Sequence, residues 1–260
     1  MNKVCVHLWL PVFALLRREI VRFLRQRSRI IGALAAPLVF WLLIGSGFHL
    51  PGLPGGMTYL AYFFPGTVVL ILLFTAIFST ISVVEDRREG FLQGVLVAPV
   101  ASEAIVLGKL LGGMTLAFAQ AMLFCVAAPL IGVPFDGGVL VRLVPALLVG
   151  GFAMVGMGFV FAWPLESTQG FHAIMNVVLV PLWLLSGALF PATPDSWMRH
   201  VVAWNPVSYA MAAVRRAFYG DAASLGLVPS YDTAMLVTGI FAVAMFLLSV
   251  GMVRWKRATF

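Results

Sequence analysis

Six long apolar stretches run through this sequence, and none has a charged residue at its centre. They cover about residues 30–50, 58–84, 105–133, 140–163, 172–190 and 233–253. A helix rises 1.5 Å per residue, so about 20 apolar residues cross the hydrocarbon core of a bilayer. The strands of a membrane barrel are about half as long and alternate in polarity, and backbone amides without partners are costly in hydrocarbon. The sequence therefore predicts an all-α polytopic membrane protein with six transmembrane helices.

The composition leaves little material for a soluble domain. Of the 260 residues, 62% are hydrophobic and 10% are charged, and the mean hydropathy is +1.02. We therefore expect one membrane domain over residues 30–260, preceded by a separate N-terminal segment over residues 1–29.

The basic residues are distributed unevenly, and this distribution predicts the topology. The formal net charge is +7, and thirteen of the 17 Lys and Arg residues precede the first span or lie close after the second and the sixth. Cytoplasmic segments of membrane proteins are enriched in Lys and Arg, so we expect both termini in the cytoplasm. The positive charge then indicates contact with membrane lipids, and we expect no nucleic-acid partner.

The N-terminal segment has the periodicity of an amphipathic helix. Four arginines recur at steps of four, three and four residues, namely Arg18, Arg22, Arg25 and Arg29. Apolar residues occupy the opposite side at helical spacing, namely Val12, Leu16, Ile20 and Phe23. This pattern predicts an interfacial helix whose arginines meet anionic lipid headgroups. The alternative is a plain positive-inside signal without a helix lying on the membrane.

The connection between the second and third spans has the composition of a short helix. Charged residues come first, and an apolar side over two turns follows, made of Phe91, Leu92, Val95 and Leu96. Two turns are too short to span and too apolar to be left in water, so we expect contact with the membrane surface or with a partner protein. The alternative is a capped elbow, in which Pro99 ends one helix and Ser102 caps the next.

The outer connection before the last span also predicts a helix. Asn205 is an N-cap residue, Pro206 suits the first helical turn, and Gly220 marks the end. At about 20 Å such a helix cannot span a bilayer, so it either lies on the outer leaflet or enters and returns. Trp204 and Tyr209 are candidate aromatic anchors at the interface.

Several other classes of function lack their characteristic residues. There is no Gly-x4-Gly-Lys-Ser/Thr phosphate loop and no His-Glu-x-x-His zinc motif. No span has a carboxylate or lysine at its centre, as an ion-coupled carrier is expected to have. An ion-coupled secondary carrier and an intramembrane enzyme are therefore the weaker alternatives.

Three motifs in order resemble one family. In chain order they are Phe64-Pro65-Gly66-Thr67, then the acid–base–Glu-Gly-Phe-Leu stretch that leads to Leu96-Val97-Ala98-Pro99-Val100-Ala101-Ser102, and then Asn205-Pro206-Val207-Ser208-Tyr209 with Arg215. With the basic N-terminal helix and the six spans, the chain resembles the membrane permease subunits of type-2 ABC (ATP-binding cassette) exporters, the drug, lipo-oligosaccharide and polysaccharide exporter class. One departure is Ala212, where relatives often carry an acid.

The resemblance implies a function and a set of partners. It implies a transport subunit, not an enzyme, which pairs with a second copy of itself or a similar permease in the cytoplasmic (inner) membrane of a prokaryote. A separate ATPase subunit would hold ATP and Mg, and this chain would bind no cofactor. The cargo would be an amphipathic, lipid-linked, glycan or drug-like compound that moves outward.

The resemblance also assigns roles to residues. The implied ATPase-coupling residues are Glu85, Arg87, Arg88, Glu89, Gly90, Phe91, Leu92, Gln93, Val95, Leu96 and Pro99. The implied outer gate, a re-entrant helix, contains Asn205, Pro206, Tyr209 and Arg215. A substrate path along the second and fifth spans would use the polar residues Thr67, Thr75, Ser79 and Asn176. For the hydroxyl residues, the alternative is a hydrogen bond to their own helix.

Overall fold

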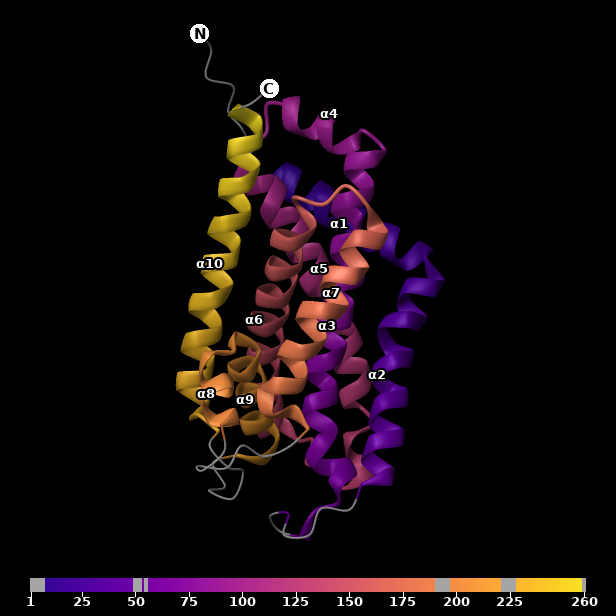
Figure 1. The fold of residues 1–260 in the computed structure, drawn as a ribbon, viewed down its shortest axis with the longest axis vertical. Coiled ribbons are helices and arrows are strands. Elements are labelled where there is room, and N and C mark those ends of the chain that lie inside the picture. The colour runs from indigo at the N-terminus through magenta and orange to yellow at the C-terminus, as the bar shows by residue number, and fades with distance from the viewer. Residues whose placement is uncertain (1–7, 49–52, 54–55, 190–196, 221–227, 259–260) are drawn as a thin grey trace.

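The protein is a bundle of helices in the computed structural model, which describes residues 8–48, 53, 56–189, 197–220 and 228–258 (Figure 1). The ends of several predicted segments, at residues 1–7, 49–50 and 190, and parts of the outer connection, at 191–196 and 221–227, lie outside the described residues. The elements in chain order are α1 (Trp9–Arg25), α2 (Arg27–Gly47), α3 (Tyr59–Arg88), α4 (Phe91–Val97), α5 (Ser102–Cys125), η2 (Ala128–Ile131), α6 (Gly137–Ala162), α7 (Thr168–Trp183), η3 (Leu184–Ala188), α8 (Met198–Trp204), α9 (Pro206–Tyr219) and α10 (Tyr231–Ala258).

The six predicted spans are confirmed as helices. Within the described residues, six helices are long and apolar enough to cross a membrane, namely α2, α3, α5, α6, α7 with η3, and α10. The protein is therefore a multi-pass membrane protein. The third span is shorter than predicted, because α5 ends at Cys125 and a separate turn of 3-10 helix with Pro129 in its first turn follows it. The fifth span ends in a π-helical turn in which Gly187 has a φ of 79°.

Helix α3 forms the centre of the bundle. Nearly all of its side chains are buried, and it contacts α2, α5, α6, α7 and α9. Helices α2 and α10 are largely exposed within the single chain. Helices α1 and α4 lie at one end of the bundle and α8 and α9 at the other, with the C-terminal end of α10 near α4 (Figure 1). We call these the α4 end and the α9 end.

Helix α1 packs closely against the start of α5 because two glycines leave room for it. A Cβ atom added at Gly108 would lie 2.9 Å from the carbonyl oxygen of Val12, and one at Gly112 would lie 2.8 Å from the Cβ atom of Glu19. Contacts this short exclude larger residues. Helix α1 is thus fixed to the bundle along one side.

The prediction of one apolar side on α1 was incomplete. The side that faces α5 consists of Val12, Leu15, Glu19 and Phe23. A second apolar side is exposed and includes Leu10, Phe13, Val21 and Leu24. Because apolar side chains on a surface helix at the end of a membrane bundle favour lipid, the second side remains consistent with a helix at the membrane interface.

Candidate functional site

The candidate functional site lies at the α4 end, where α3 breaks into the short helix α4. Gly90 connects the two helices with a φ of 78°, a conformation that only glycine adopts easily. After α4, Ala98 is extended before Pro99, and α5 then begins at Ser102. The sequence therefore forms a separate two-turn helix between two long spans, as predicted.

The apolar side of α4 packs against its own chain, whereas the sequence led us to expect that it contacts the membrane surface or a partner protein. Leu92 is 2% exposed and Leu96 is 7% exposed, while Phe91 and Val95 are partly buried against the same core. These four residues hold α4 on its own chain, so they do not form the free surface of the helix. The free surface consists of Gln93, Gly94 and Val97, and Val97 is 74% exposed.

The C-terminal side of α4 is held by an arginine from the last helix. The Arg257 guanidinium donates hydrogen bonds to the carbonyl oxygens of Leu96 at 2.8 Å, Ala98 at 2.8 Å and Val100 at 2.6 Å. One side chain thus satisfies the carbonyl groups that the end of α4 leaves without helical partners. In the sequence, Arg257 is recognisable only as one of the basic residues after the sixth span, because its partners are 157 to 161 residues away.

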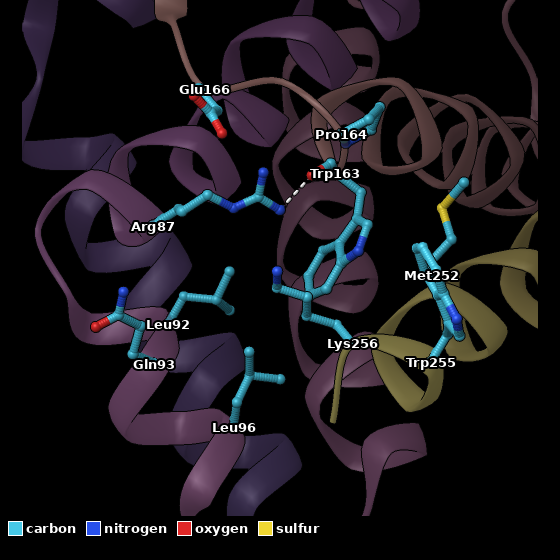
Figure 2. Close-up of a pocket in the computed structure, with 10 residues that line it drawn as sticks. All are labelled: Arg87, Leu92, Gln93, Leu96, Trp163, Pro164, Glu166, Met252, Trp255 and Lys256. Carbon is cyan, nitrogen blue, oxygen red and sulfur yellow. Dashed lines mark hydrogen bonds between the residues drawn. The ribbon is translucent and has the colours of Figure 1, made fainter. Parts of the chain in front are cut away.

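A cavity lies behind α4, between this helix, the end of α6 and the end of α10 (Figure 2). Its volume is about 460 Å³. Its lining is mainly apolar and aromatic, and consists of Arg87, Leu92, Gln93, Leu96, Trp163, Pro164, Glu166, Met252, Trp255 and Lys256. Arg87 donates hydrogen bonds to the carbonyl oxygens of Trp163 and Leu165, so it links the end of α3 to the connection between α6 and α7.

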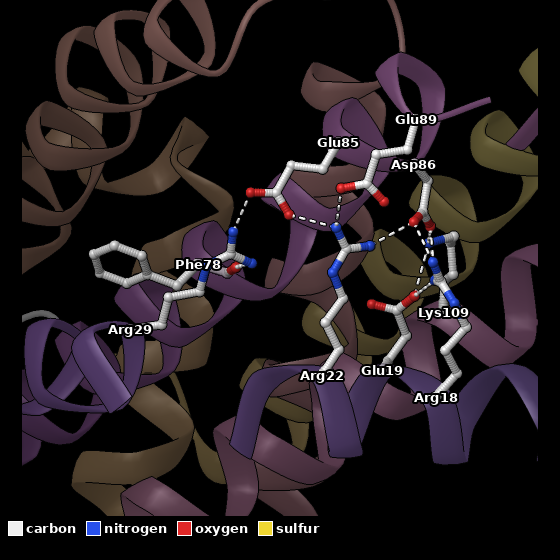
Figure 3. A network of polar contacts seen from close by, with 9 residues as sticks. All are labelled: Arg18, Glu19, Arg22, Arg29, Phe78, Glu85, Asp86, Glu89 and Lys109. Atoms are coloured by element: carbon white, nitrogen blue, oxygen red, sulfur yellow. Dashed lines mark hydrogen bonds and ion pairs between the residues drawn. The ribbon is translucent and has the colours of Figure 1, made fainter. Parts of the chain in front are cut away.

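A network of charged residues connects α1, α3 and α5 beside the start of α4 (Figure 3). Asp86 is fully buried, and one of its oxygens accepts a hydrogen bond from the Lys109 amine at 2.6 Å. The same amine donates to Glu19 at 2.8 Å, and the Arg18 guanidinium contacts both Asp86 and Glu19. The buried cation and the buried anions thus neutralise one another, as buried charges require.

Arginines of α1 and of the start of α2 have protein partners that the sequence did not predict. Arg22 bonds Glu85 at 2.7 Å and Glu89 at 3.3 Å, and Arg29 also bonds Glu85. Arg18, Arg22 and Arg29 therefore lie against the end of α3 rather than on the outside of the bundle. Of the four residues assigned to lipid headgroups, Arg25 is exposed.

The network extends to α4 through Arg18. Its guanidinium carbon lies 3.7 Å from the centroid of the Phe91 ring at the start of α4. Partial burial lowers the pKa of Arg18, but the hydrogen bond to Asp86 and the nearby carboxylates outweigh this effect and raise it. Arg18 therefore remains charged and joins α1, α3 and α4 at one point.

The residues predicted to line a substrate path do not all face the same space. The hydroxyls of Thr67 and Ser79 are buried and donate to carbonyl groups of their own helix. Thr75 donates to Gln120 of α5 at 2.6 Å, so it links two spans inside the chain. Asn176 is exposed in the middle of α7. Only Asn176 therefore faces outward from the single chain.

The predicted helix at the α9 end is confirmed, together with its capping residues. The Asn205 side chain accepts a hydrogen bond from the Val207 amide at 3.0 Å and donates one to the carbonyl oxygen of Leu182 at 2.6 Å. Pro206 is the first helical residue, and Tyr209 donates to the carbonyl oxygen of Ala203 at 2.9 Å. Arg215 is buried near Gly187 at the kink of the fifth span.

The chain matches a known family over most of its length. The model of the ABC-2 type transporter family matches residues 11–219, so the chain belongs to this family of transport permeases. It is 28% identical to the daunorubicin resistance ABC transporter permease protein DrrB1 of Streptomyces coeruleorubidus, over 85% of this chain and 77% of that protein. It is 26% identical to nodulation protein J of Rhizobium leguminosarum bv. trifolii, over 95% and 92% respectively. It is 23% identical to the putative transport permease ycf38 of Cyanophora paradoxa, over 92% and 81%.

Proposed function

We propose that this chain is the membrane subunit of an ABC exporter and that α4 is its contact with a separate ATPase subunit. The observation that carries the proposal is the arrangement of α4, which is anchored on its own chain by Leu92, Leu96 and Arg257 and leaves Gln93, Gly94 and Val97 exposed. When a partner displaces a rigidly held helix with one free side, the elements that hold the helix move with it. The ATPase would hold ATP and Mg, because this chain has no phosphate loop.

The charged network offers a route from α4 to the spans. A displacement of α4 would act on the central helix α3 through Gly90, and on α1 and α5 through Arg18, Asp86 and Lys109. Packed side chains and paired charges carry such coupling when the elements move as rigid units. In this proposal α1 is an interfacial helix, and Arg25 is the arginine that reaches lipid headgroups.

A second copy of the chain, or a similar permease, would complete the transport path. Helix α7 exposes His172 and Asn176 on the same side as Ala173 and Val177. A polar residue in the middle of a span favours a protein partner or a water-filled path over lipid. We therefore propose that Asn176 faces the path between two subunits, and that Asn205, Pro206, Tyr209 and Arg215 belong to its outer gate.

We propose the cytoplasmic membrane of a prokaryote as the location, with both termini in the cytoplasm. This orientation would put α4 on the side where ATP is available, in agreement with the excess of basic residues near the α4 end. The cargo would be amphipathic, lipid-linked, glycan or drug-like, a range that includes daunorubicin, to which the name of the DrrB1 relative refers.

The test is site-directed crosslinking of α4 to a co-expressed ATPase subunit in membranes. In a chain without Cys5 and Cys125, single cysteines at Gln93 and Val97 should crosslink to the ATPase, whereas one at Leu92 should not, because Leu92 is buried. A cysteine at Trp204, which is exposed at the α9 end, is the matched control. No crosslink from Gln93 or Val97 in an assembled complex would contradict the proposal. Transport by this chain alone under a proton gradient would favour a secondary carrier.

A further inference from the structure

At the α9 end, Arg215 is a buried cation without a carboxylate partner among the described residues. Its side chain is 2% exposed. Its guanidinium donates hydrogen bonds to the carbonyl oxygens of Gly187 at 3.2 Å and Ala188 at 3.4 Å, and it lies 4.5 Å from the centroid of the Tyr62 ring. Carbonyl dipoles and an aromatic face offset a positive charge only in part.

A small cavity adjoins this guanidinium. It lies between η3 and α9, has a volume of about 20 Å³, and is lined by Ser186, Gly187, Val202, Ser208, Met211, Ala212, Arg215, Val228 and Pro229. Two buried polar atoms of its lining have no hydrogen-bond partner, the Nε of Arg215 and the Oγ of Ser208. The Nε of Arg215 can only donate a hydrogen bond, and the Oγ of Ser208 can donate one as well. A space of this size holds one water molecule or one small ion.

The charge of the site selects between these occupants. A water molecule would satisfy the two donors but would leave the guanidinium charge without a counter-ion. An anion would do both, because it accepts from both donors and neutralises the cation. We propose that this cavity binds one small monovalent anion, of the size of chloride, which joins Arg215 of α9 to the kinked end of the fifth span. This site is independent of the proposed contact with an ATPase.

The experiment uses the full-length chain in lipid nanodiscs, with thermal unfolding followed by tryptophan fluorescence in sodium chloride, bromide or gluconate at equal concentration. Chloride and bromide should raise the unfolding midpoint in a saturable manner, by about 3 °C at a tenfold excess over the dissociation constant, while gluconate is too large to enter. Arg215→Met should abolish the difference between the salts. Arg199→Met, which removes an exposed arginine at the same end of the bundle, should keep it.

Ala212 provides a second variant that adds a charge instead of removing one. It lines the cavity three residues before Arg215 on α9, so Ala212→Asp would place a carboxylate in the site. This variant should unfold at the same temperature in all three salts, and in gluconate it should be more stable than Ala212→Asn, which fills the space without a charge. Equal midpoints of the unmodified chain in all salts, with Ala212→Asp no more stable than Ala212→Asn, would overturn the proposal in favour of a water molecule. Asp195 and Asp221 lie outside the described residues. Halide dependence that appears only after one of them is changed, in Asp195→Asn or Asp221→Asn, would overturn the proposal in favour of a carboxylate of the chain itself as the counter-ion.

Discussion

The two ends of the bundle differ in whether their buried charged side chains have partners of opposite charge. At the α4 end, buried Asp86 and Glu19 pair with Lys109, and arginines of α1 complete the network. At the α9 end, Arg215 lies against carbonyl oxygens and Tyr62, and no carboxylate among the described residues pairs with it. The first arrangement is complete within the chain, whereas the second leaves room for an external ion.

This difference fits the roles that we propose for the two ends. Several ion pairs that link three helices fix their relative positions, since breaking any one of them leaves another charge buried without a partner. The α4 end is therefore suited to move as one unit with α1, α3 and α5. At the α9 end, the contact between Arg215 and the kink of the fifth span is weaker than these ion pairs, which fits the opening of the outer gate that we propose.

The largest effect is expected at the α4 end, from Asp86→Asn. This variant keeps the shape of the side chain but leaves Lys109 and Arg18 without their shared anion, and breaking a buried ion pair in this way costs about 3–5 kcal/mol. The measurement is thermal unfolding of the purified chain, together with the amount recovered from membranes. Glu89→Gln is the matched control, because Glu89 is 61% exposed and its pair with Arg22 contributes about 1 kcal/mol at most. Equal losses for both variants would show that the network does not hold the helices together.

A smaller effect is expected at the α9 end, from Arg215→Met. Methionine replaces much of the aliphatic stem and removes the cation, so no opposite charge is left buried. The free energy of unfolding should fall by about 1–3 kcal/mol, because the hydrogen-bond donors to Gly187 and Ala188 are lost. Unfolding in gluconate is the appropriate measurement, because no small anion then contributes. A loss larger than that of Asp86→Asn would reverse the comparison between the two ends.

Much of the fold follows from the sequence because hydrocarbon imposes strict rules. Span length, the glycine at the end of α9 and the capping residue Asn205 all act locally, so their positions were predictable. The end of the third span was not, because an apolar run continues through residues 126–133 although α5 ends at Cys125. Hydropathy measures the environment of a segment and does not detect a change from one kind of helix to another.

The candidate site was less predictable, because it depends on contacts between distant residues. The periodicity of Phe91, Leu92, Val95 and Leu96 correctly indicates an apolar side but does not reveal whether its own chain or a partner covers it. The pairing of α1 and the start of α2 with the end of α3 joins residues more than 50 apart in the sequence. One signal was available: Glu19 is an acid within a segment rich in arginine, and it lies on the side of α1 that faces Lys109.

Loss of the Arg257 hydrogen bonds at the end of α4 is expected to affect the coupling of ATP hydrolysis to transport more than the stability of the chain. Arg257→Gln would lose most of the hydrogen bonds to the carbonyl oxygens of Leu96, Ala98 and Val100, at a cost of about 1–2 kcal/mol in this partly exposed position. ATP hydrolysis by the assembled complex should then respond less to transported substrate. Arg254→Gln is the control, because Arg254 is well exposed and pairs with Glu103 at the surface. Unchanged substrate stimulation in Arg257→Gln would mean that α4 does not need this support.

The smallest effect on the chain itself is expected from Val97→Asp, which changes the free side of α4. Val97 has few neighbours in the single chain, so the substitution should change the free energy of unfolding by about 0.5 kcal/mol or less. Burial of a carboxylate in an interface is unfavourable, so the same substitution should weaken assembly with the ATPase by about tenfold or more.

Leu92→Ala, on the inward side of α4, should affect stability and not assembly. It removes a buried side chain and destabilises the chain by about 2–5 kcal/mol, but the protein that still folds should bind the ATPase with unchanged affinity. Unfolding and co-purification with the ATPase, measured on both variants, separate the two sides of one helix. If Leu92→Ala weakened assembly of folded protein and Val97→Asp did not, the inward and outward sides of α4 would have to be exchanged.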